Sequence, residues 1–198
     1  MLTHLTKESW IRYQKLDPSF HLSQQEFEEL WNQRPTDESY VRMYGKKIAI
    51  PRRQQAYGQS YAFSGTENKA IPVTPLIQRY MDLANQMEES QDPFKNGGAV
   101  FNMAFLNWYQ DGKEYIGYHS DDEKMIIQGS SIYCFSFGAE RDFLLKDKSS
   151  GEVKSVVLED NSLIVMGGDC QKTHKHSIPK RSKVRGPRVS ITLRKFRG

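Results

Sequence analysis

The second half of the chain carries short runs in which apolar residues alternate with polar ones, and this two-residue period predicts β-strands. Turn residues such as Asp111-Gly112 and Gly167-Gly168 separate the runs. Strands are expected over residues 101–109, 131–138, 142–145, 153–158, 162–166 and 188–194. Many short strands at this spacing are typical of a β-sandwich or jelly roll rather than of a parallel α/β sheet.

Two segments of the first half have a helical period instead. Ser23 and Glu26 form the pattern of a capping box and predict a helix that ends before Pro35. Thr74 followed by Pro75 predicts the start of a second helix. Helices early and strands late indicate an α+β fold built on a β core.

Length and composition limit the class of protein. The chain has 198 residues, of which 37% are hydrophobic and 12% aromatic, as expected for one folded domain with at most a small extension. No apolar run has membrane-spanning length, and the first residues lack the apolar segment of a signal peptide. Cys134 and Cys170 make no disulfide framework, so we expect an intracellular, reducing compartment.

Charge is distributed unevenly along the chain. Residues 171–198 contain ten Lys or Arg and no Asp or Glu, whereas the remainder holds 18 basic and 24 acidic residues. A basic face on an acidic body suits a polyanionic partner, most simply nucleic acid. A solvated basic tail is the other interpretation, and charge alone does not separate the two.

Two histidines and one carboxylate are candidate metal ligands. His119 and Asp121 are two residues apart, so on an extended segment both side chains point the same way. A third ligand would come from the later cluster that holds His174 and His176. Two histidines and one carboxylate on one face of an iron atom form the 2-His-1-carboxylate facial triad. The spacing of Cys170 from the later histidines is not that of a structural zinc site.

The strand expected over residues 188–194 has an unusual polar face. The side chains of Arg188, Ser190, Thr192 and Arg194 all lie on that face. Two arginines and two hydroxyls make a poor core face, but they suit an anionic ligand held by guanidinium groups.

Between residues 40 and 65, arginines and lysines are interleaved with tyrosines. Cations that reach phosphates, beside aromatic rings that stack on bases, are typical of nucleic-acid binding. The alternative is a pair of β-strands whose aromatic residues pack on a core, and taken alone the stretch favours that alternative.

Taken together, the motifs of this chain resemble the AlkB family of iron(II)- and 2-oxoglutarate-dependent dioxygenases. The resemblance covers residues 40–198, and its upstream motifs are similar to the branch that repairs duplex or single-stranded DNA. The motifs that carry it are Asn107-x-Tyr109, His119-Ser120-Asp121-Asp122-Glu123, Ser136-Phe137-Gly138-Ala139-x-Arg141-Asp142-Phe143, His176-Ser177-Ile178-Pro179, Pro187-Arg188-Val189-Ser190-Ile191-Thr192-Leu193-Arg194, Pro51-Arg52-Arg53-Gln54-x-x-Tyr57-Gly58 and Tyr61-x-Phe63-Ser64-Gly65.

The resemblance implies a fold and a division of the chain. Residues 99–198 would form a double-stranded β-helix, which is a jelly-roll or cupin-like catalytic core. Residues 1–39 would form an N-terminal strand and helix extension. Residues 40–98 would form a β-hairpin lid for nucleotide recognition, with its supporting helix. The whole would be one compact domain, and we expect a monomer that does not bind membranes.

The resemblance also implies binding sites for iron(II), 2-oxoglutarate and dioxygen. The metal ligands would be His119, Asp121 and His176. The co-substrate residues would be Asn107, Tyr109, Arg188, Ser190, Thr192 and Arg194. The implied reaction is oxidative demethylation of N-alkylated DNA bases of the 1-methyladenine and 3-methylcytosine type. It is a direct-reversal repair that releases succinate, carbon dioxide and formaldehyde.

Base recognition is assigned by the same resemblance. The substrate-binding residues would be Met43, Tyr44, Arg52, Tyr61, Phe63, Ser64 and Glu123. Met43 and Tyr44 correspond to a hydrophobic finger that fills the gap left by a flipped base in duplex DNA. Glu123 would lie beside the edge of the base and favour cationic lesions.

Some positions depart from the family pattern, and other functions stay open. His174 stands where Trp is common, Ser190 where Asn is common, and Lys47-Ile48 replace an aromatic pair. The alternatives are an RNA demethylase or a protein hydroxylase of the same superfamily, or a cupin-like binding module without catalysis. A nuclear and a cytoplasmic location are both open.

Overall fold

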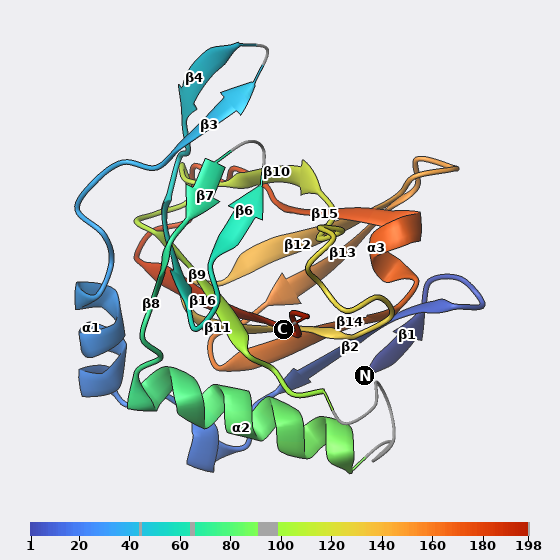
Figure 1. The fold of residues 1–198 in the computed structure, drawn as a ribbon, viewed down its shortest axis with the longest axis horizontal. Coiled ribbons are helices and arrows are strands. Elements are labelled where there is room, and N and C mark those ends of the chain that lie inside the picture. The colour runs from blue at the N-terminus through green and yellow to red at the C-terminus, as the bar shows by residue number, and fades with distance from the viewer. Residues whose placement is uncertain (44, 64–65, 91–98, 198) are drawn as a thin grey trace.

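The computed structural model describes residues 1–43, 45–63, 66–90 and 99–197, with side chains for all of these except residues 42, 43, 47, 63 and 66. Two β-sheets face each other, and two helices cover one of them (Figure 1). Within the described ranges, no helix is long and apolar enough to cross a lipid bilayer.

The larger sheet has eight strands among the described residues, in the order β1-β2-β14-β11-β16-β9-β5-β8. Its strands are β1 (Leu2–His4), β2 (Ser9–Lys15), β5 (Arg53–Tyr57), β8 (Ala70–Ile71), β9 (Met103–Tyr109), β11 (Ile132–Gly138), β14 (Ser162–Gly168) and β16 (Arg188–Arg194). The pairing of β2 with β14 runs along the full length of both strands. The N-terminal strands are therefore part of this sheet.

The smaller sheet has four strands in the described part of the chain, in the order β10-β15-β12-β13. Its strands are β10 (Ile116–His119), β12 (Arg141–Asp147), β13 (Val153–Leu158) and β15 (His174–Ile178). Two hairpins are separate from both sheets, namely β3 (Tyr40–Met43) with β4 (Lys46–Ala49) and β6 (Tyr61–Phe63) with β7 (Thr66–Asn68). The β3–β4 hairpin projects from the body of the molecule in Figure 1.

Both predicted helices begin at the predicted caps. Helix α1 (Gln24–Asn32) begins after Ser23, whose hydroxyl accepts from the Glu26 amide while the Glu26 carboxylate accepts from the Ser23 amide. Helix α2 (Pro75–Glu89) begins after Thr74, whose hydroxyl accepts a hydrogen bond from the first turn. The shorter helical turns are η1 (Pro18–Phe20) and α3 (Cys170–Thr173).

The strand predictions over residues 153–158 and 188–194 are confirmed residue for residue, as β13 and β16. The strand expected over residues 142–145 is longer and runs from Arg141 to Asp147. It is longer because it has a hydrogen-bonded neighbour on each side, β13 and β15. The predicted α+β fold with a β core is therefore confirmed.

One predicted turn is wrong. Gly167 and Gly168 continue β14 and pair with Trp10 and Ser9 of β2. A β-carbon on Gly167 would lie 2.1 Å from the Trp10 ring, so glycine is what lets β2 approach this closely.

The larger sheet is apolar on its outer face, where α2 packs. The Tyr80 ring of α2 lies 5.0 Å from the rings of both Phe135 and Phe137, measured between centroids. Val189 and Ile191 of β16 belong to the same cluster. Each fully buried side chain of this kind contributes roughly 1.5–3 kcal/mol to stability. The alternate residues of β16 face the other way, into the space between the sheets.

Candidate metal and co-substrate site

Three side chains that could hold a metal ion meet between the two sheets. His119 ends β10, His176 lies in the middle of β15, and Asp121 is in the loop after β10. One ligand atom from each residue lies within 4.8 Å of the other two. The two strands pair so that His119 is opposite His176, and their ring centroids are 4.2 Å apart. Strand pairing thus unites ligands that are distant in sequence into one metal-ligand group.

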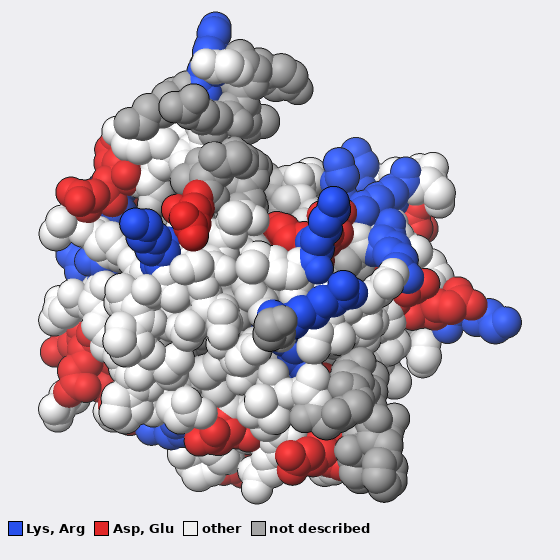
Figure 2. All heavy atoms as spheres, in the orientation of Figure 1, with Lys and Arg blue, Asp and Glu red and all other residues white. Residues whose placement is uncertain are grey.

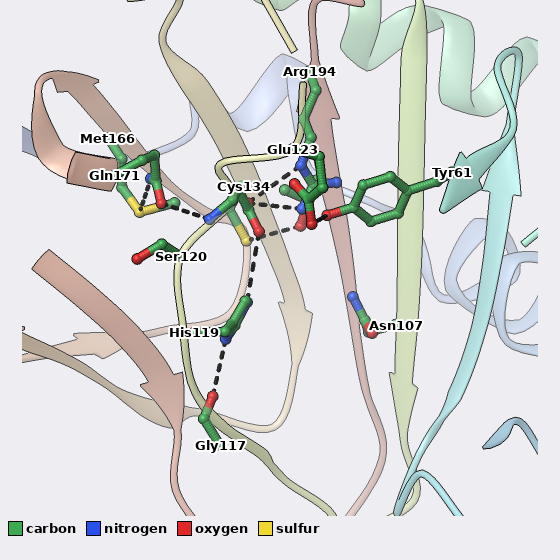
Figure 3. Close-up of polar contacts among 12 residues, drawn as sticks. Tyr61, Asn107, Gly117, His119, Ser120, Glu123, Cys134, Met166, Gln171 and Arg194 are labelled. Atoms are coloured by element: carbon green, nitrogen blue, oxygen red, sulfur yellow. Dashed lines mark hydrogen bonds and ion pairs between the residues drawn. The ribbon is translucent and has the colours of Figure 1, made fainter. Parts of the chain in front are cut away.

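Hydrogen bonds orient His119 and Asp121 within the metal-ligand group (Figure 3). The Nδ1 atom of His119 lies 2.9 Å from the Gly117 carbonyl oxygen, so Nδ1 carries the proton and Nε2 can bind a metal. The Oδ2 atom of Asp121 accepts from the Arg194 guanidinium at 2.7 and 3.2 Å. The buried Oδ1 atom has no hydrogen-bond partner among the described residues and lies 3.7 Å from His119 Nε2. One carboxylate oxygen and one imidazole nitrogen therefore face the same point.

The loop that carries Asp121 is held by the segment that leads into β15. The Gln171 side chain accepts from the Asp121 amide at 2.9 Å, and the Ser120 hydroxyl donates to the His174 carbonyl at 2.9 Å. Figure 3 shows Gln171 and Ser120 on the side of this loop away from the cavity centre. No sequence pattern pointed to Gln171, because a lone amide in a short helical turn is common.

The charges of the metal-ligand group suit a divalent cation. Burial alone would raise the pKa of the Asp121 carboxyl, but Arg194 and the two histidines hold that pKa well below its usual range. Burial lowers the pKa of His176 to about 3, and the neighbouring His119 adds to this effect. Burial likewise lowers the pKa of His119. At neutral pH the group is therefore one carboxylate and two neutral imidazoles, the protonation states that bind metals.

The structure separates the two histidines that the sequence left as rivals. His174 is opposite Asp147 of β12, and its Nδ1 atom lies 2.7 Å from the Thr173 hydroxyl. Its Nε2 atom lies 3.7 Å from the Asp147 carboxylate. Within the described residues, the group that could hold a metal contains His176 and not His174.

The polar face predicted for β16 lines the same cavity as the metal-ligand group. Arg188, Ser190, Thr192 and Arg194 are all buried at the edge of this cavity, whose volume is about 610 Å³. Burying two guanidinium groups beside an apolar core is unfavourable unless they meet an anion. The sequence prediction that this face suits an anionic ligand therefore agrees with where the face lies.

Arg188 has the features of a carboxylate-binding residue. Its side chain is 1% exposed, and its Nε atom donates to the Ser136 hydroxyl at 3.0 Å. Its Nη1 and Nη2 atoms are buried and have no partner among the described residues. A carboxylate matches two such parallel donors in a bidentate pair. The Tyr109 ring lies against the same guanidinium, with its centroid 5.0 Å away. These residues fit 2-oxoglutarate, whose two ends are carboxylates.

Strand β9 brings two further predicted residues to this place. It pairs with β16 so that Tyr109 is opposite Arg188 and Asn107 is opposite Ser190. The Asn107 oxygen accepts from Arg52 Nε at 2.7 Å. Arg52, which the resemblance assigned to the substrate, is thus buried next to a predicted co-substrate residue. The contacts of Ser136 with Arg188 and of Arg52 with Asn107 join segments that are distant in sequence, so the sequence alone does not display them.

A second polar group borders Arg194. The Tyr61 hydroxyl donates to Glu123 at 2.7 Å, and Figure 3 shows Tyr61 pointing from its strand toward that carboxylate. The Tyr61 ring lies 4.8 Å from the Arg194 guanidinium and 5.0 Å from the Phe105 ring. The second Glu123 oxygen is buried without a hydrogen-bond partner in the described part of the chain. Burial and the charge of Asp121 raise the pKa of Glu123.

Four predicted substrate residues cannot be placed against this group. Tyr44 and Ser64 lie outside the described residues, and the side chains of Met43 and Phe63 are not described. Their hairpins do border the site, because Ile48 of β4 and Tyr61 of β6 line the cavity. The assignment of these four residues stays a prediction.

Comparison with known proteins agrees with this geometry. The sequence profile of the 2OG-Fe(II) oxygenase superfamily matches residues 11–194. A human protein named DNA oxidative demethylase ALKBH2 is 32% identical over 215 aligned positions, which cover 98% of this chain and 79% of the human one. The Bos taurus protein of the same name is 35% identical over 167 positions, which cover 79% of this chain. The chain spans only 57% of the length of that bovine relative.

A solved structure titled "The structure of OsALKBH1" has the same fold. It matches with a TM-score of 0.58 and 15% sequence identity, over 99% of this chain and 100% of that one. At that identity the match supports the fold alone, and it agrees with the predicted jelly-roll core. The matched superfamily implies iron(II), 2-oxoglutarate and dioxygen, as the resemblance predicted, and the metal-ligand group fits the metal. The chain therefore belongs to the 2OG-Fe(II) oxygenase superfamily and, within it, to the AlkB family of dioxygenases.

Proposed function

We propose that this chain catalyses iron(II)- and 2-oxoglutarate-dependent demethylation of N-alkylated bases in DNA, of the 1-methyladenine and 3-methylcytosine type. One observation carries the proposal: a single cavity contains the metal-ligand group, the unpaired donors of Arg188 and the Tyr61–Glu123 pair. These are sites for a metal, a carboxylate and a polar base edge. Similarity to proteins named DNA oxidative demethylase favours DNA as the substrate.

Each side of the cavity has its own task in this reaction. The metal-ligand group would hold iron(II), which when bound supplies the oxidising chemistry together with dioxygen and 2-oxoglutarate. Arg188 would bind the far carboxylate of the co-substrate, with Asn107 and Tyr109 beside it. Arg194 donates twice to Asp121, so it would keep that ligand ionised and in place, and it would add positive charge near the other end of the co-substrate.

Glu123 would select the base. One of its oxygens accepts from Tyr61, and the other is buried and has no hydrogen-bond partner among the described residues, so it could meet a ligand. An ionised carboxylate stabilises a positively charged base such as 1-methyladenine more than a neutral base. Phe63 would stack on the flipped base, and Met43 and Tyr44 would fill the gap that it leaves in a duplex.

Basic side chains near the cavity suit the phosphates of a nucleic acid. Figure 2 shows Lys and Arg gathered over β12, β15 and α3. The exposed lysines of these elements include Lys146, Lys172 and Lys175. Lys146 Nζ lies 5.7 Å from the ring of Tyr118, which itself lines the cavity. Exposed cations at the edge of a substrate cavity favour a polyanion over a neutral protein as the substrate.

The basic run over residues 171–198 is not simply a solvated tail. Arg188, Arg194 and Lys195 are buried, and Lys195 forms an ion pair with Glu88 of α2 at 2.5 Å. The other lysines and arginines of the run are exposed. Of the exposed members, Lys172 pairs with Asp169 and Arg181 with Asp142. The remaining exposed lysines and arginines would be the ones to meet phosphates.

An assay on matched substrates tests the proposal. The protein is incubated with iron(II), ascorbate, 2-oxoglutarate and oligonucleotides that carry one 1-methyladenine, as single-stranded DNA, duplex DNA or RNA. Loss of one methyl group from DNA, with an equal amount of succinate, is the expected result. Demethylation of RNA alone would instead indicate an RNA demethylase. If no succinate forms with any substrate, the remaining interpretation is a cupin-like binding module without catalysis.

A further inference from the structure

Arg52 lies at the junction between the β3–β4 hairpin and the larger sheet. It comes immediately before β5, is 6% exposed and lines the cavity. Its guanidinium donates to the Asn107 side chain at 2.7 Å, to the Gln54 side chain at 3.3 Å and to the Tyr115 carbonyl at 3.4 Å. Arg52 therefore joins three segments of the chain at one end of the cavity.

The second feature of Arg52 is its charge, which makes no close ion pair with a described carboxylate. In the described part of the chain, neither Arg52 nor Arg188 forms an ion pair within 4.0 Å. Both border the same end of the cavity, because Asn107 accepts from Arg52 while Tyr109, two residues later on β9, is opposite Arg188. A buried charge is normally paired. Two buried guanidiniums that make no ion pair with any described residue make this end of the cavity favourable for a carboxylate ligand.

The contact with Arg52 fixes which way Asn107 faces. A guanidinium only donates, so the Asn107 atom that it meets is the amide oxygen, and the NH2 group must point elsewhere. No described residue accepts a hydrogen bond from that NH2 group, and Asn107 lines the cavity. Figure 3 shows Asn107 across the cavity from His119. Its N–H donors are therefore available to a ligand between the two sheets.

We propose that Arg52 is a positioning residue of the co-substrate site. It holds Asn107 with the NH2 group toward the cavity, where that group donates to a carboxylate of 2-oxoglutarate. Without Arg52, the amide can rotate and present its oxygen, which repels a carboxylate. The inference rests on the proposed function in taking 2-oxoglutarate as the ligand at this end. It differs from the sequence prediction, which placed Arg52 among the residues that contact the damaged base.

A double-mutant cycle read by binding rather than by turnover tests the inference. Arg52→Met, Asn107→Ala and the double variant are loaded with iron(II) without oxygen, and calorimetry gives the dissociation constant of 2-oxoglutarate. Each single variant should bind about tenfold more weakly, the loss expected for one charge-assisted hydrogen bond. The double variant should bind no more weakly than Asn107→Ala alone, because Arg52 acts through Asn107.

Arg53→Met is the matched control. Arg53 is the next residue, but on β5 it is opposite Trp108 of β9 and so faces the other side of the sheet. Its variant should keep the wild-type dissociation constant for 2-oxoglutarate. Arg52→Lys keeps the charge and one donor, so it should lose less affinity than Arg52→Met, and it serves as the test if the Met variant does not fold.

Two results would overturn the inference. The first is that Arg52→Met binds 2-oxoglutarate as the wild type does but binds methylated DNA more weakly. Arg52 would then be a substrate-binding residue, as the sequence predicted. Additive losses in the double variant would mean that Arg52 does not act through Asn107. Demethylation by the wild-type protein is measured separately, so a failure of the proposed DNA activity leaves the binding cycle readable.

Discussion

The two walls of the cavity are built from different chemistry. On the smaller sheet and the loop after β10, the metal-ligand group consists of titratable side chains whose charge depends on burial and on one another. On the larger sheet, Arg52 and Arg188 are permanently charged and are held by the neutral side chains of Asn107 and Ser136. We call the side with His119, Asp121 and His176 the metal wall, and the side with Arg52, Arg188 and Asn107 the co-substrate wall. Ligand binding at the metal wall therefore depends on protonation. Ligand binding at the co-substrate wall depends on the direction of its hydrogen-bond donors.

One contact joins the two walls. Arg194 belongs to β16 of the larger sheet, Asp121 follows β10 of the smaller one, and both side chains are buried. Removing one partner of such a pair leaves an uncompensated buried charge. The walls are thus chemically distinct but not independent. Substitutions on each side test how far metal binding and co-substrate binding can be changed separately.

The largest effect should come from Asp121→Asn, which damages both walls. It removes the anionic metal ligand, so turnover should fall by on the order of a thousandfold or more. It also leaves Arg194 buried without its acidic partner, so stability should fall by roughly 3–5 kcal/mol. Bound iron, succinate release and urea unfolding measure these changes. Asp122→Asn, at the exposed neighbour, is the control, and equal iron content in both variants would contradict the ligand assignment.

Arg188→Met should damage the co-substrate wall alone. The variant loses two buried donors, so the affinity for 2-oxoglutarate should fall roughly a hundredfold, while iron content stays at the wild-type level. Calorimetry and metal analysis give the two readouts. Arg185→Met changes an exposed arginine three residues earlier and should leave both unchanged. Loss of iron from Arg188→Met would show that the walls are not separable.

Low pH should destabilise the fold through the histidines of the metal wall, whereas the arginines stay charged. In the folded chain the pKa of His176 is about 3, whereas a histidine in an unfolded chain titrates at about 6.5. Between these values the unfolded chain binds a proton that the folded chain does not. The metal-free protein should therefore lose roughly 1 kcal/mol of stability per pH unit as pH falls from about 6.5 toward 3. Urea titrations at several pH values give the free energy of unfolding, which should depend less steeply on pH in His176→Gln. An unchanged pH dependence in that variant would show that His176 is not the cause.

The smallest effect should come from Glu123→Gln, at the edge of both walls. The preference for 1-methyladenine over a neutral methylated base is measured as a ratio of kcat/KM values. In the Glu123→Gln variant this ratio should be about tenfold lower than in the wild-type protein. Burial and Asp121 raise the pKa of Glu123, so the wild-type preference should also weaken as pH falls through that raised value, since the protonated acid is uncharged. In Glu123→Gln this pH dependence should be gone. Equal ratios in the two proteins at neutral pH would remove Glu123 from base selection.

The parts of the fold that depend on local alternation could be predicted from the sequence. Strand β16 was predicted to its last residue, with its polar face identified, because a two-residue period is visible in seven consecutive positions. The helix starts were predicted from Ser23 and Thr74, whose caps involve residues within one turn. The ligands His119 and Asp121 were predicted for the same reason, since two-residue spacing is local.

The parts that depend on pairing between distant segments could not be predicted in this way. His174 and His176 lie on one face of β15, and only the register with β10 brings His176 to His119. The role proposed for Arg52 depends on its contact with Asn107, which lies on β9 and is distant in sequence. Gly167 reads as a turn residue until the close approach of β2 is known.

The pairing of β2 with β14 has a consequence for how the chain folds. Its register joins Ser9 to Gly168 and Lys15 to Ser162, so sheet formation requires segments from opposite ends of the sequence to meet. Such closure loses chain entropy before any contact compensates for it, which makes folding slow. Both walls of the cavity must be in place before iron and co-substrate can bind. Their binding therefore stabilises the finished structure and slows its unfolding, without speeding its formation.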